Sequence, residues 1–423
     1  MPTSPLYRAF ASFAVPLVPL ALRDARQRAA HAARLATPAA LEAWASQHRD
    51  MSRDLAWFHA SSVGEGLQAR AVLEAYRTLN PNDQIIYTHY SPSAESFAAS
   101  IGAEWAGYLP YDRADDVQRV LRAVRPNLLV FTKLDLWPEL ATQAAAAGCR
   151  VSMVAGTVSA DSNRLRWPSQ SLTAPGYAAL HFVGAIAEPD LARLIALGCD
   201  PEKVTVTGDP RIDSVLEVMW AASNEPVPVE LGPIQNVLVA GSTWPEDEKI
   251  LMEAMGHVHA RFPDARLMLV PHEPTLAHLL DIEAAFVPGA LRPPVPLASL
   301  APGDEPEILV IDRVGMLSKL YAAGAMAYVG GGFGHRGIHS VLEPAAWSRP
   351  VIIGPNDRGS RDAAMLAAGG GLVRLPRHNA VAALVEQWCR WLENPMECDR
   401  AGRAARNALE QDRGAARRNA VLL

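Results

Sequence analysis

Cysteine is scarce in this chain, with only four residues among 423. They are Cys149, Cys199, Cys389 and Cys398, and no two of them form a CxxC pair. Disulfide frameworks and zinc modules need closely spaced cysteines, so this spacing excludes both and indicates a reducing compartment. We expect each cysteine to be a small buried hydrophobic residue. The sequence shows no cluster of metal ligands either, and we expect neither a bound metal nor a cofactor.

Excess positive charge is also absent. The chain has 39 Lys and Arg residues against 45 Asp and Glu residues, which gives a formal net charge of −6. General nucleic-acid binders carry a basic surface, so we expect no nucleic-acid partner.

A long hydrophobic run is missing as well. The most apolar stretch, residues 9–22, is shorter than the ~20 residues that a membrane-spanning helix needs. It is followed by Arg23, Arg26, Arg28 and Arg34. A signal peptide would carry its positive charge before the apolar core instead. We expect residues 1–35 to lie in a membrane interface, with the arginines against anionic headgroups. The alternative is an amphipathic helix packed on the first domain.

Short apolar runs alternating with helical patterns are what the chain does contain, and they predict parallel α/β domains. The predicted strands are 55–59, 85–88, 128–131, 151–155, 181–183, 204–207, 237–240, 267–270, 308–311, 326–329 and 351–353. The proline-rich stretch 221–233 predicts a linker. We therefore expect a Rossmann-like domain over 36–220 and a second one over 234–423, which includes the C-terminal helices. By analogy of fold, this predicts an α/β protein of the GT-B type, with two Rossmann-like domains facing across a cleft.

A glycine-rich loop, GGGFGHRGIHSVLEP over residues 330–344, directly follows the predicted strand 326–329. A helix is expected to begin near Ser340. Strand, glycine loop and helix start form a common phosphate site, and Glu343 on the first turn would suit ribose hydroxyls. The alternative is a tight turn that binds nothing.

A carboxylate follows the first strand in HASSVGEG. Ser61 or Ser62 is expected to cap the next helix, which places Glu65 near its N-terminus. There the helix dipole favours the ionised carboxylate, which can accept a proton from an attacking hydroxyl. A capping glutamate that serves only the helix explains the same residues.

Three further strand ends carry polar residues. Lys133 and Asp135 precede Trp137 and Pro138, where an ion pair on the surface is the alternative to a functional site. Ser242 and Thr243 stand at a helix start that suits phosphate, although a simple N-cap needs the same residues. His272 and Glu273 lie between two prolines, a pattern that also describes a rigid turn.

These motifs, in this order, resemble the 3-deoxy-D-manno-octulosonic acid (Kdo) transferases of lipopolysaccharide synthesis. The similarity covers residues 6–355 and is strongest in HASSVGEG, LDLWPEL, GSTWPEDE and GIHSVLEPAAWSRPVIIGP. It implies an inverting, metal-independent glycosyltransferase that uses CMP-Kdo as donor and a lipid A precursor as acceptor. It also implies a monotopic enzyme on the cytoplasmic face of the inner membrane.

The resemblance also implies roles for individual residues. Glu65 matches the family's catalytic base and Asp135 matches a second acid. The donor-binding residues would be Ser242, Thr243, His272, Gly337, His339, Ser340 and Glu343, and the acceptor-side residues would be Ser62 and Lys133.

Several positions depart from the family pattern. Lys133 replaces an acid, His272 and Glu273 replace an Arg-His pair, and Ser340 replaces an asparagine. The stretch 155–157 replaces the family's N-A-R. A divergent Kdo transferase, a transferase with another donor or acceptor, and a protein that has lost catalysis all remain open. So do a nucleotide-sugar epimerase and a non-catalytic membrane-associated binding protein.

Overall fold

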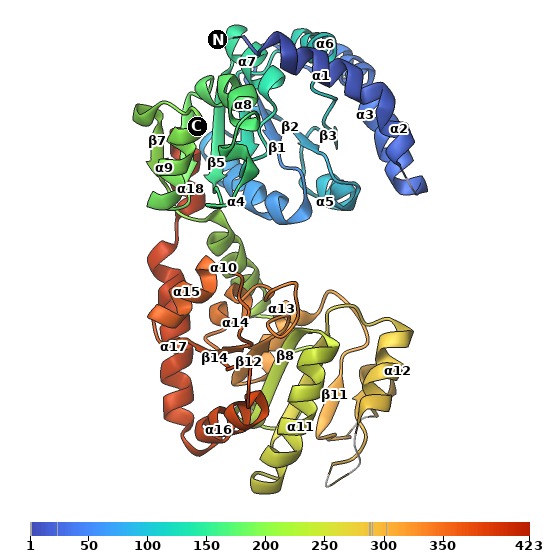
Figure 1. Cartoon of the computed structure of the whole chain (residues 1–423), viewed down its shortest axis with the longest axis vertical. Coiled ribbons are helices and arrows are strands. Elements are labelled where there is room, and N and C mark those ends of the chain that lie inside the picture. Colours follow the sequence, from blue (N-terminus) through green and yellow to red (C-terminus); the bar gives the residue numbers. More distant parts are fainter. Residues whose placement is uncertain (1, 23, 287–288, 290, 302) are drawn as a thin grey trace. The chain divides into compact units, whose positions relative to one another are not determined.

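The computed structural model describes all of the chain except residues 1, 23, 287, 288, 290 and 302. Arg23, one of the arginines discussed above, therefore lies outside the described residues. The chain divides into two compact units, residues 1–214 with 413–423 and residues 215–412, which we call the first and second domains. Figure 1 shows that each contains a sheet flanked by helices.

The first domain has a seven-stranded parallel sheet in the order β3-β2-β1-β4-β5-β6-β7. Its strands are β1 (Leu55–His59), β2 (Gln84–His89), β3 (Trp105–Tyr108), β4 (Leu128–Thr132), β5 (Arg150–Gly156), β6 (Phe182–Ala185) and β7 (Val204–Val206). The central strands are buried along their whole length, because helices cover both faces of a parallel sheet. The edge strand β3 is only partly buried, which explains why its hydrophobic pattern did not predict it.

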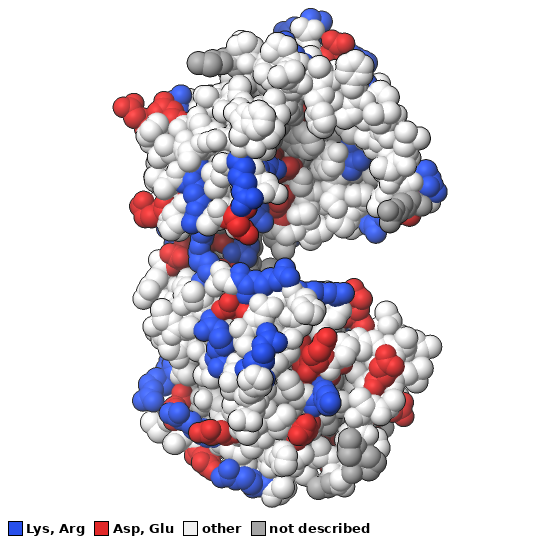
Figure 2. All heavy atoms as spheres, in the orientation of Figure 1, with Lys and Arg blue, Asp and Glu red and all other residues white. Residues whose placement is uncertain are grey.

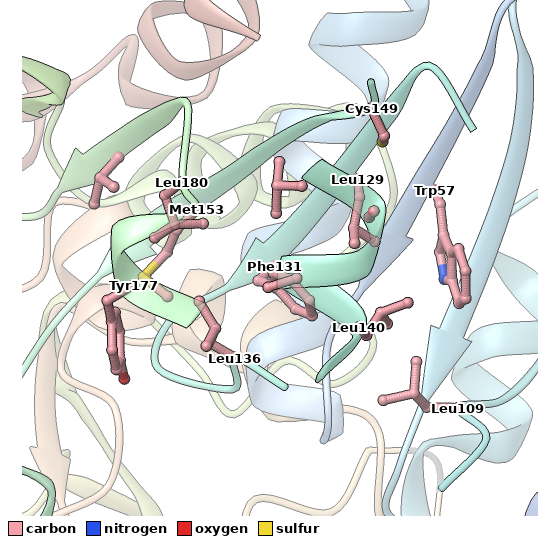
Figure 3. Packing of buried hydrophobic residues seen from close by; sticks show 14 of the residues in the cluster. Trp57, Leu109, Leu129, Phe131, Leu136, Leu140, Cys149, Met153, Tyr177 and Leu180 are labelled. Carbon is pink, nitrogen blue, oxygen red and sulfur yellow. The ribbon is translucent and has the colours of Figure 1, made fainter. Parts of the chain in front are cut away.

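Helices connect these strands and cover the sheet. They are α1 (Pro5–Ala14), α2 (Val18–Ala21), α3 (Ala25–His48), α4 (Val63–Leu79), α5 (Glu95–Ser100), α6 (Ala114–Val124), α7 (Pro138–Ala146), α8 (Ser169–Ala178), α9 (Glu188–Leu197) and α18 (Ala415–Leu422). Short 3-10 turns occur at η1 (Val15–Leu17), η2 (Pro92–Ala94), η3 (Asn163–Leu165) and η4 (Pro201–Lys203). Figure 3 shows one face of the core, where Phe131 of β4 and Leu136 of the following loop lie beside Leu140 and Tyr177.

The second domain has its own seven-stranded parallel sheet, in the order β10-β11-β9-β8-β12-β13-β14. Its strands are β8 (Val237–Thr243), β9 (Arg266–Pro271), β10 (Val295–Pro296), β11 (Ile308–Val310), β12 (Met326–Val329), β13 (Val351–Ile353) and β14 (Leu372–Arg374). Its helices are α11 (Pro245–Arg261), α12 (Leu276–Ala285), α13 (Leu317–Leu320), α14 (Leu342–Ala346), α15 (Arg361–Ala368), α16 (Ala380–Glu393) and α17 (Pro395–Asp412). Two 3-10 turns, η5 (Ile234–Asn236) and η7 (Tyr321–Ala323), flank β8 and β12, and η6 (Leu297–Ser299) follows β10.

The domain boundaries differ from those expected. The unit boundary falls inside α10 (Pro210–Ala222). The expected linker 221–233 is packed on the second domain, where Val229 and Leu231 belong to a hydrophobic core. Helix α18, expected in the second domain, belongs to the first. Its small residues pack in the core beneath α4, and the Asp213 carboxylate accepts the N–H groups of Gly414 and Ala416 at its N-terminus.

The N-terminal segment does not end at residue 35. Helix α3 continues to His48. One of its sides is buried against the first domain through Thr37, Leu41 and Trp44. Arg34, expected to meet headgroups, is buried and stacks on the ring of Tyr90 at 3.9 Å. The aromatic surroundings hold its cation inside the protein. All four cysteines are free and buried, as predicted.

Candidate active site

Each sheet reverses its strand order at one place. In the first domain β1 and β4 are neighbours, with His59 opposite Phe131. In the second domain β8 and β12 are neighbours, with Gly241 opposite Val329. Ligands of such folds bind beyond the carboxyl ends of the strands at these reversals. The sequence-predicted residues gather at these two places, as one cluster in each domain.

Glu65 lies at the N-terminus of α4, immediately after β1. Ser62 is the N-cap, and its hydroxyl accepts the Glu65 N–H at 3.4 Å. In return, Glu65 Oε2 accepts the N–H of Ser61 at 3.0 Å. This is a capping arrangement, and it also fixes the half-buried carboxylate at the sheet edge where a substrate is expected. The capping and the functional interpretations are therefore compatible.

Burial raises the pKa of the Glu65 carboxyl, and the negative charge of Asp135 raises it further, while Lys133 opposes both. The Ser61 N–H lowers the pKa, as expected at a helix N-terminus, but burial prevails. A carboxylate with a raised pKa is a stronger base once it is ionised.

Asp135 is the most heavily hydrogen-bonded group of this cluster. Its Oδ2 atom accepts from His59 Nε2 at 2.7 Å, from Trp137 Nε1 at 3.3 Å and from the Ser61 hydroxyl. Burial alone would raise the pKa of Asp135, but these donors prevail and lower it to about 2. Asp135 is thus ionised at neutral pH, and its Oδ2 atom is hydrogen-bonded to three neighbouring side chains.

Lys133, directly after β4, adopts a left-handed backbone conformation with φ of 63°. Its N–H donates to the carbonyl oxygen of Val154 at 2.8 Å, which joins the loop to β5. Few residues with a side chain adopt this conformation, and such residues are frequent at functional sites.

In the second-domain cluster, the glycine loop after β12 packs so closely that side chains would not fit. A Cβ atom at Gly330 would lie 2.3 Å from the carbonyl oxygen of Ser242. One at Gly331, whose φ is 95°, would lie 2.2 Å from the carbonyl oxygen of Gly337. The buried Asp247 holds the loop, because its carboxylate accepts the N–H of Gly331 at 2.8 Å and that of Trp244 at 3.0 Å.

Four side chains stack beside this loop. The guanidinium of Arg336 lies 3.9 Å from the ring of Trp244, and His272 and His339 stack with ring centroids 4.2 Å apart. Trp244 Nε1 donates to His339 Nε2 at 3.0 Å. Burial, together with the charges of His272 and Arg336, lowers the pKa of His339 to about 4. His339 is therefore neutral at physiological pH, and Arg336 carries the permanent positive charge of this cluster.

The remaining predicted donor residues differ in their exposure to solvent. Thr243 is fully buried, and its hydroxyl donates to Glu248 at 2.9 Å. This hydroxyl therefore makes a hydrogen bond within the domain and does not face a ligand. Ser242 is half-buried with φ of 53°. The helix expected near Ser340 begins at Leu342, and Ser340 itself is exposed. Glu343 lies in the first turn of α14, as predicted, and burial raises its pKa.

Sequence reasoning missed several members of the two clusters. His59 and Asp247 occur in the quoted motifs and Arg336 occurs in the glycine loop, but none of them was assigned a role. Asp247 had a usable signal, because it stands three residues after Trp244 at a helix start beginning with proline. His59 had none, since a histidine at a strand end is most often a core residue. No group of three or more potential metal ligands is brought together among the residues with described positions.

Known proteins resemble the chain in sequence. Residues 25–214 match the family model described as 3-deoxy-D-manno-octulosonic-acid transferase. A 3-deoxy-D-manno-octulosonic acid transferase of Bordetella pertussis is 29% identical over 86% of this chain and 85% of its own length. The Haemophilus influenzae transferase of the same name is 25% identical over 87% and 86%. Relatives named Kdo transferases thus match most of the chain at low identity, and the family model matches its first domain.

Solved structures agree with the two-domain α/β architecture. A putative UDP-N-acetylglucosamine 2-epimerase from Listeria monocytogenes superimposes with a TM-score of 0.58 at 12% identity, over 85% of this chain and 94% of that one. At this identity the likeness concerns the fold alone. An epimerase and a glycosyltransferase both share the fold with this chain, so the fold does not distinguish these activities.

Proposed function

We propose that this chain transfers Kdo from CMP-Kdo to a lipid A precursor in lipopolysaccharide core synthesis. The observation that carries the proposal is the agreement between family and geometry. Relatives named Kdo transferases match most of the chain. Glu65, the residue that matches the family's base, lies at the strand reversal of its sheet with a raised pKa.

In the proposed reaction, Glu65 takes the proton from a sugar hydroxyl of the acceptor. The hydroxyl oxygen forms a bond to the anomeric carbon of Kdo, and the bond from that carbon to the phosphate oxygen breaks. The configuration inverts, and CMP leaves. Phosphate is a good leaving group, so the step needs one base and no separate acid. A positioned base of this kind contributes ~10²–10⁴-fold to the rate.

The second domain would hold the departing phosphate. The N–H groups of its glycine loop and the Arg336 cation suit an anion, and Ser242, His272 and His339 lie around the same strand ends. Glu343 on α14 would accept ribose hydroxyls. Thr243 would contribute indirectly, through Glu248. Catalysis would need no metal.

The test is a transfer assay with purified protein, CMP-Kdo and a tetra-acylated lipid A precursor, analysed by mass spectrometry. We expect a product heavier by one or more Kdo residues. A matched reaction with UDP-N-acetylglucosamine and no acceptor tests epimerase activity. Isomerised sugar there, with no Kdo transfer, would replace our proposal by the epimerase alternative. Nucleotide binding without either product would favour a non-catalytic protein.

We further propose that the N-terminal segment rests on the cytoplasmic face of the inner membrane. Leu6, Phe10, Phe13, Leu17 and Leu20 recur at helical spacing and are each at least 60% exposed. Such an exposed stripe is typical of a helix that lies in a membrane interface. In Figure 2 the surface between the two ends of the α1–α2 region of Figure 1 is mostly uncharged, and charged residues lie at those ends. No helix among the residues with described positions is long and apolar enough to cross a bilayer.

Two contacts fasten this segment to the first domain. The Tyr7 hydroxyl donates to Asp112 at 2.7 Å, and Arg8 pairs with Glu139 at 2.9 Å. Asp112 also accepts the N–H groups of Glu139 and Leu140 at the start of α7. The test is co-sedimentation with vesicles that contain anionic lipid. Replacing Phe10 and Phe13 by serine should release the protein. The same change at Met396, exposed in the second domain, should not.

A further inference from the structure

A single serine connects the two carboxylates of the first-domain cluster. The Ser61 hydroxyl donates to Asp135 Oδ2, and the Ser61 backbone N–H donates to Glu65 Oε2 at 3.0 Å. Asp135 is held in turn by the fully buried His59, whose other ring nitrogen contacts Thr88 Oγ1 at 2.9 Å. Trp57 Nε1 donates to the same Thr88 oxygen at 2.8 Å. Asp135 therefore stands between His59 and Ser61 in a hydrogen-bonded chain that runs from Trp57 to Glu65.

Lys133 is two residues away from Asp135 on the same loop and has the opposite charge. The loop thus presents one negative and one positive group to a single half-buried carboxylate. From the other elements packed against Glu65, the end of β1 contributes His59 and β2 contributes Tyr87. The Tyr87 hydroxyl is buried and has no hydrogen-bond partner among the residues with described positions. On α4 itself the next charged residue is Arg70, more than one turn away.

We propose that Asp135 is a positioning residue that orients Glu65 through Ser61, and that the negative charge of Asp135 and the positive charge of Lys133 act on Glu65 in opposite directions. This rests on the proposed function, in which Glu65 is the base. Asp135 touches no reacting atom in this scheme. Its three donors keep it ionised, so it supplies a fixed negative charge and is a weaker base than Glu65.

The direction of each effect follows from charge. A neighbouring negative charge disfavours the ionised carboxylate, and a positive charge favours it. Removing the negative charge with Asp135→Asn should make Glu65 ionise at lower pH. Removing the positive charge with Lys133→Met should make it ionise at higher pH. A structural role for either residue would change the amount of active protein but not the pH at which Glu65 ionises.

The experiment measures kcat/KM for Kdo transfer against pH in the wild type and both variants. The acid limb of this profile reports the ionisation of the free enzyme's base. We expect the limb to move to lower pH in Asp135→Asn and to higher pH in Lys133→Met. Lys133→Arg keeps the charge and should leave the limb in place. Ser61→Ala should lower kcat with little movement of the limb, because it removes the connecting hydroxyl but neither charge.

A second measurement needs no turnover. The carboxyl carbon of Glu65 is titrated by NMR in protein labelled with ¹³C-glutamate, and its signal is assigned by its loss in Glu65→Gln. Opposite displacements in Asp135→Asn and Lys133→Met would support the inference even if no Kdo is transferred, in which case only the proposed function would fail. Unmoved titrations in folded variants, or displacements in the same direction, would overturn it.

Discussion

The two strand reversals of this molecule have the same architecture and different chemistry. At the first, between β1 and β4, the polar groups are carboxylates, hydroxyls and a histidine joined by hydrogen bonds. At the second, between β8 and β12, backbone N–H groups of a glycine loop lie beside stacked rings and an arginine. The first arrangement is suited to moving a proton, and the second is suited to holding an anion. In the proposed reaction, a repeated scaffold would therefore support two different tasks.

Both places have a residue with a side chain in the left-handed conformation. Lys133 follows β4 with φ of 63°, and Ser242 near the end of β8 has φ of 53°. Such backbone costs about 1–3 kcal/mol where the surrounding structure enforces it. Lys133 stands in the turn after β4, whereas Ser242 stands at a register shift within β8. Five other described residues with side chains adopt the same conformation, so the two sites are distinguished by the side chains around them.

The largest effect is expected from Glu65→Gln, which tests whether the two clusters have different tasks. If proton transfer belongs to the first domain alone, turnover should fall ~10²–10⁴-fold while nucleotide binding persists. Kinetics and a thermal-shift titration with CMP measure the two quantities. Glu74→Gln, at an exposed position on the same helix, is the matched control. Normal turnover in Glu65→Gln would remove this residue from catalysis.

The corresponding change in the second domain is Gly331→Ala. The new Cβ would overlap the Gly337 carbonyl, and the left-handed backbone adds strain, so we expect about 3 kcal/mol of lost stability. CMP affinity should fall with it. Gly370→Ala imposes a similar φ with no atom within 4 Å, so it should leave CMP affinity intact. Chemical denaturation and CMP titration provide the measurements. Equal losses of affinity in both variants would argue against the loop as the anion site.

The hydrogen-bonded carboxylate of the first cluster should give the protein an acid-sensitive stability. The pKa of Asp135 lies at about 2, below its ordinary value of 3.8. Because the folded value is depressed, the stabilisation is present above about pH 4 and is lost as the pH falls towards 2. The contribution is roughly 2 kcal/mol. Asp135→Asn should flatten the dependence of urea-unfolding free energy on pH in this window. An exposed control, Asp264→Asn, should not.

The smallest effect is expected from Trp244→Phe, which tests whether the stacked rings beside the glycine loop contribute to binding. Trp244→Phe removes the hydrogen bond to His339 and should cost about 1 kcal/mol of stability. CMP affinity should also fall, because His339 loses its orientation. Trp347→Phe removes a similar bond, from Nε1 to the Ser318 carbonyl at 2.6 Å, away from the loop. Trp347→Phe should reduce stability by a similar amount without changing CMP affinity. Identical binding by both variants would contradict a binding role for the stack.

Much of the fold could be predicted from local patterns. The eleven strands predicted from short apolar runs all correspond to strands of the two sheets. Strands β3, β10 and β14 were missed, because edge strands are only partly buried and their composition is mixed. The domain boundary was misplaced for a similar reason. Val229 and Leu231 stand in a proline-rich stretch, and only their burial in the second core shows that the stretch is part of that domain.

The sequence by itself determined the α/β class, the positions of the strand ends and the motif residues that follow them, because these depend on neighbours along the chain. Tertiary structure alone decided how those residues are used. It turned the Thr243 hydroxyl inwards to Glu248, buried Arg34 among tyrosines and brought His59 to Asp135 across 76 positions of sequence. Burial and hydrogen bonding depend on contacts between distant segments. The raised pKa of Glu65 and the lowered pKa of Asp135 therefore follow from packing and cannot be seen in a motif.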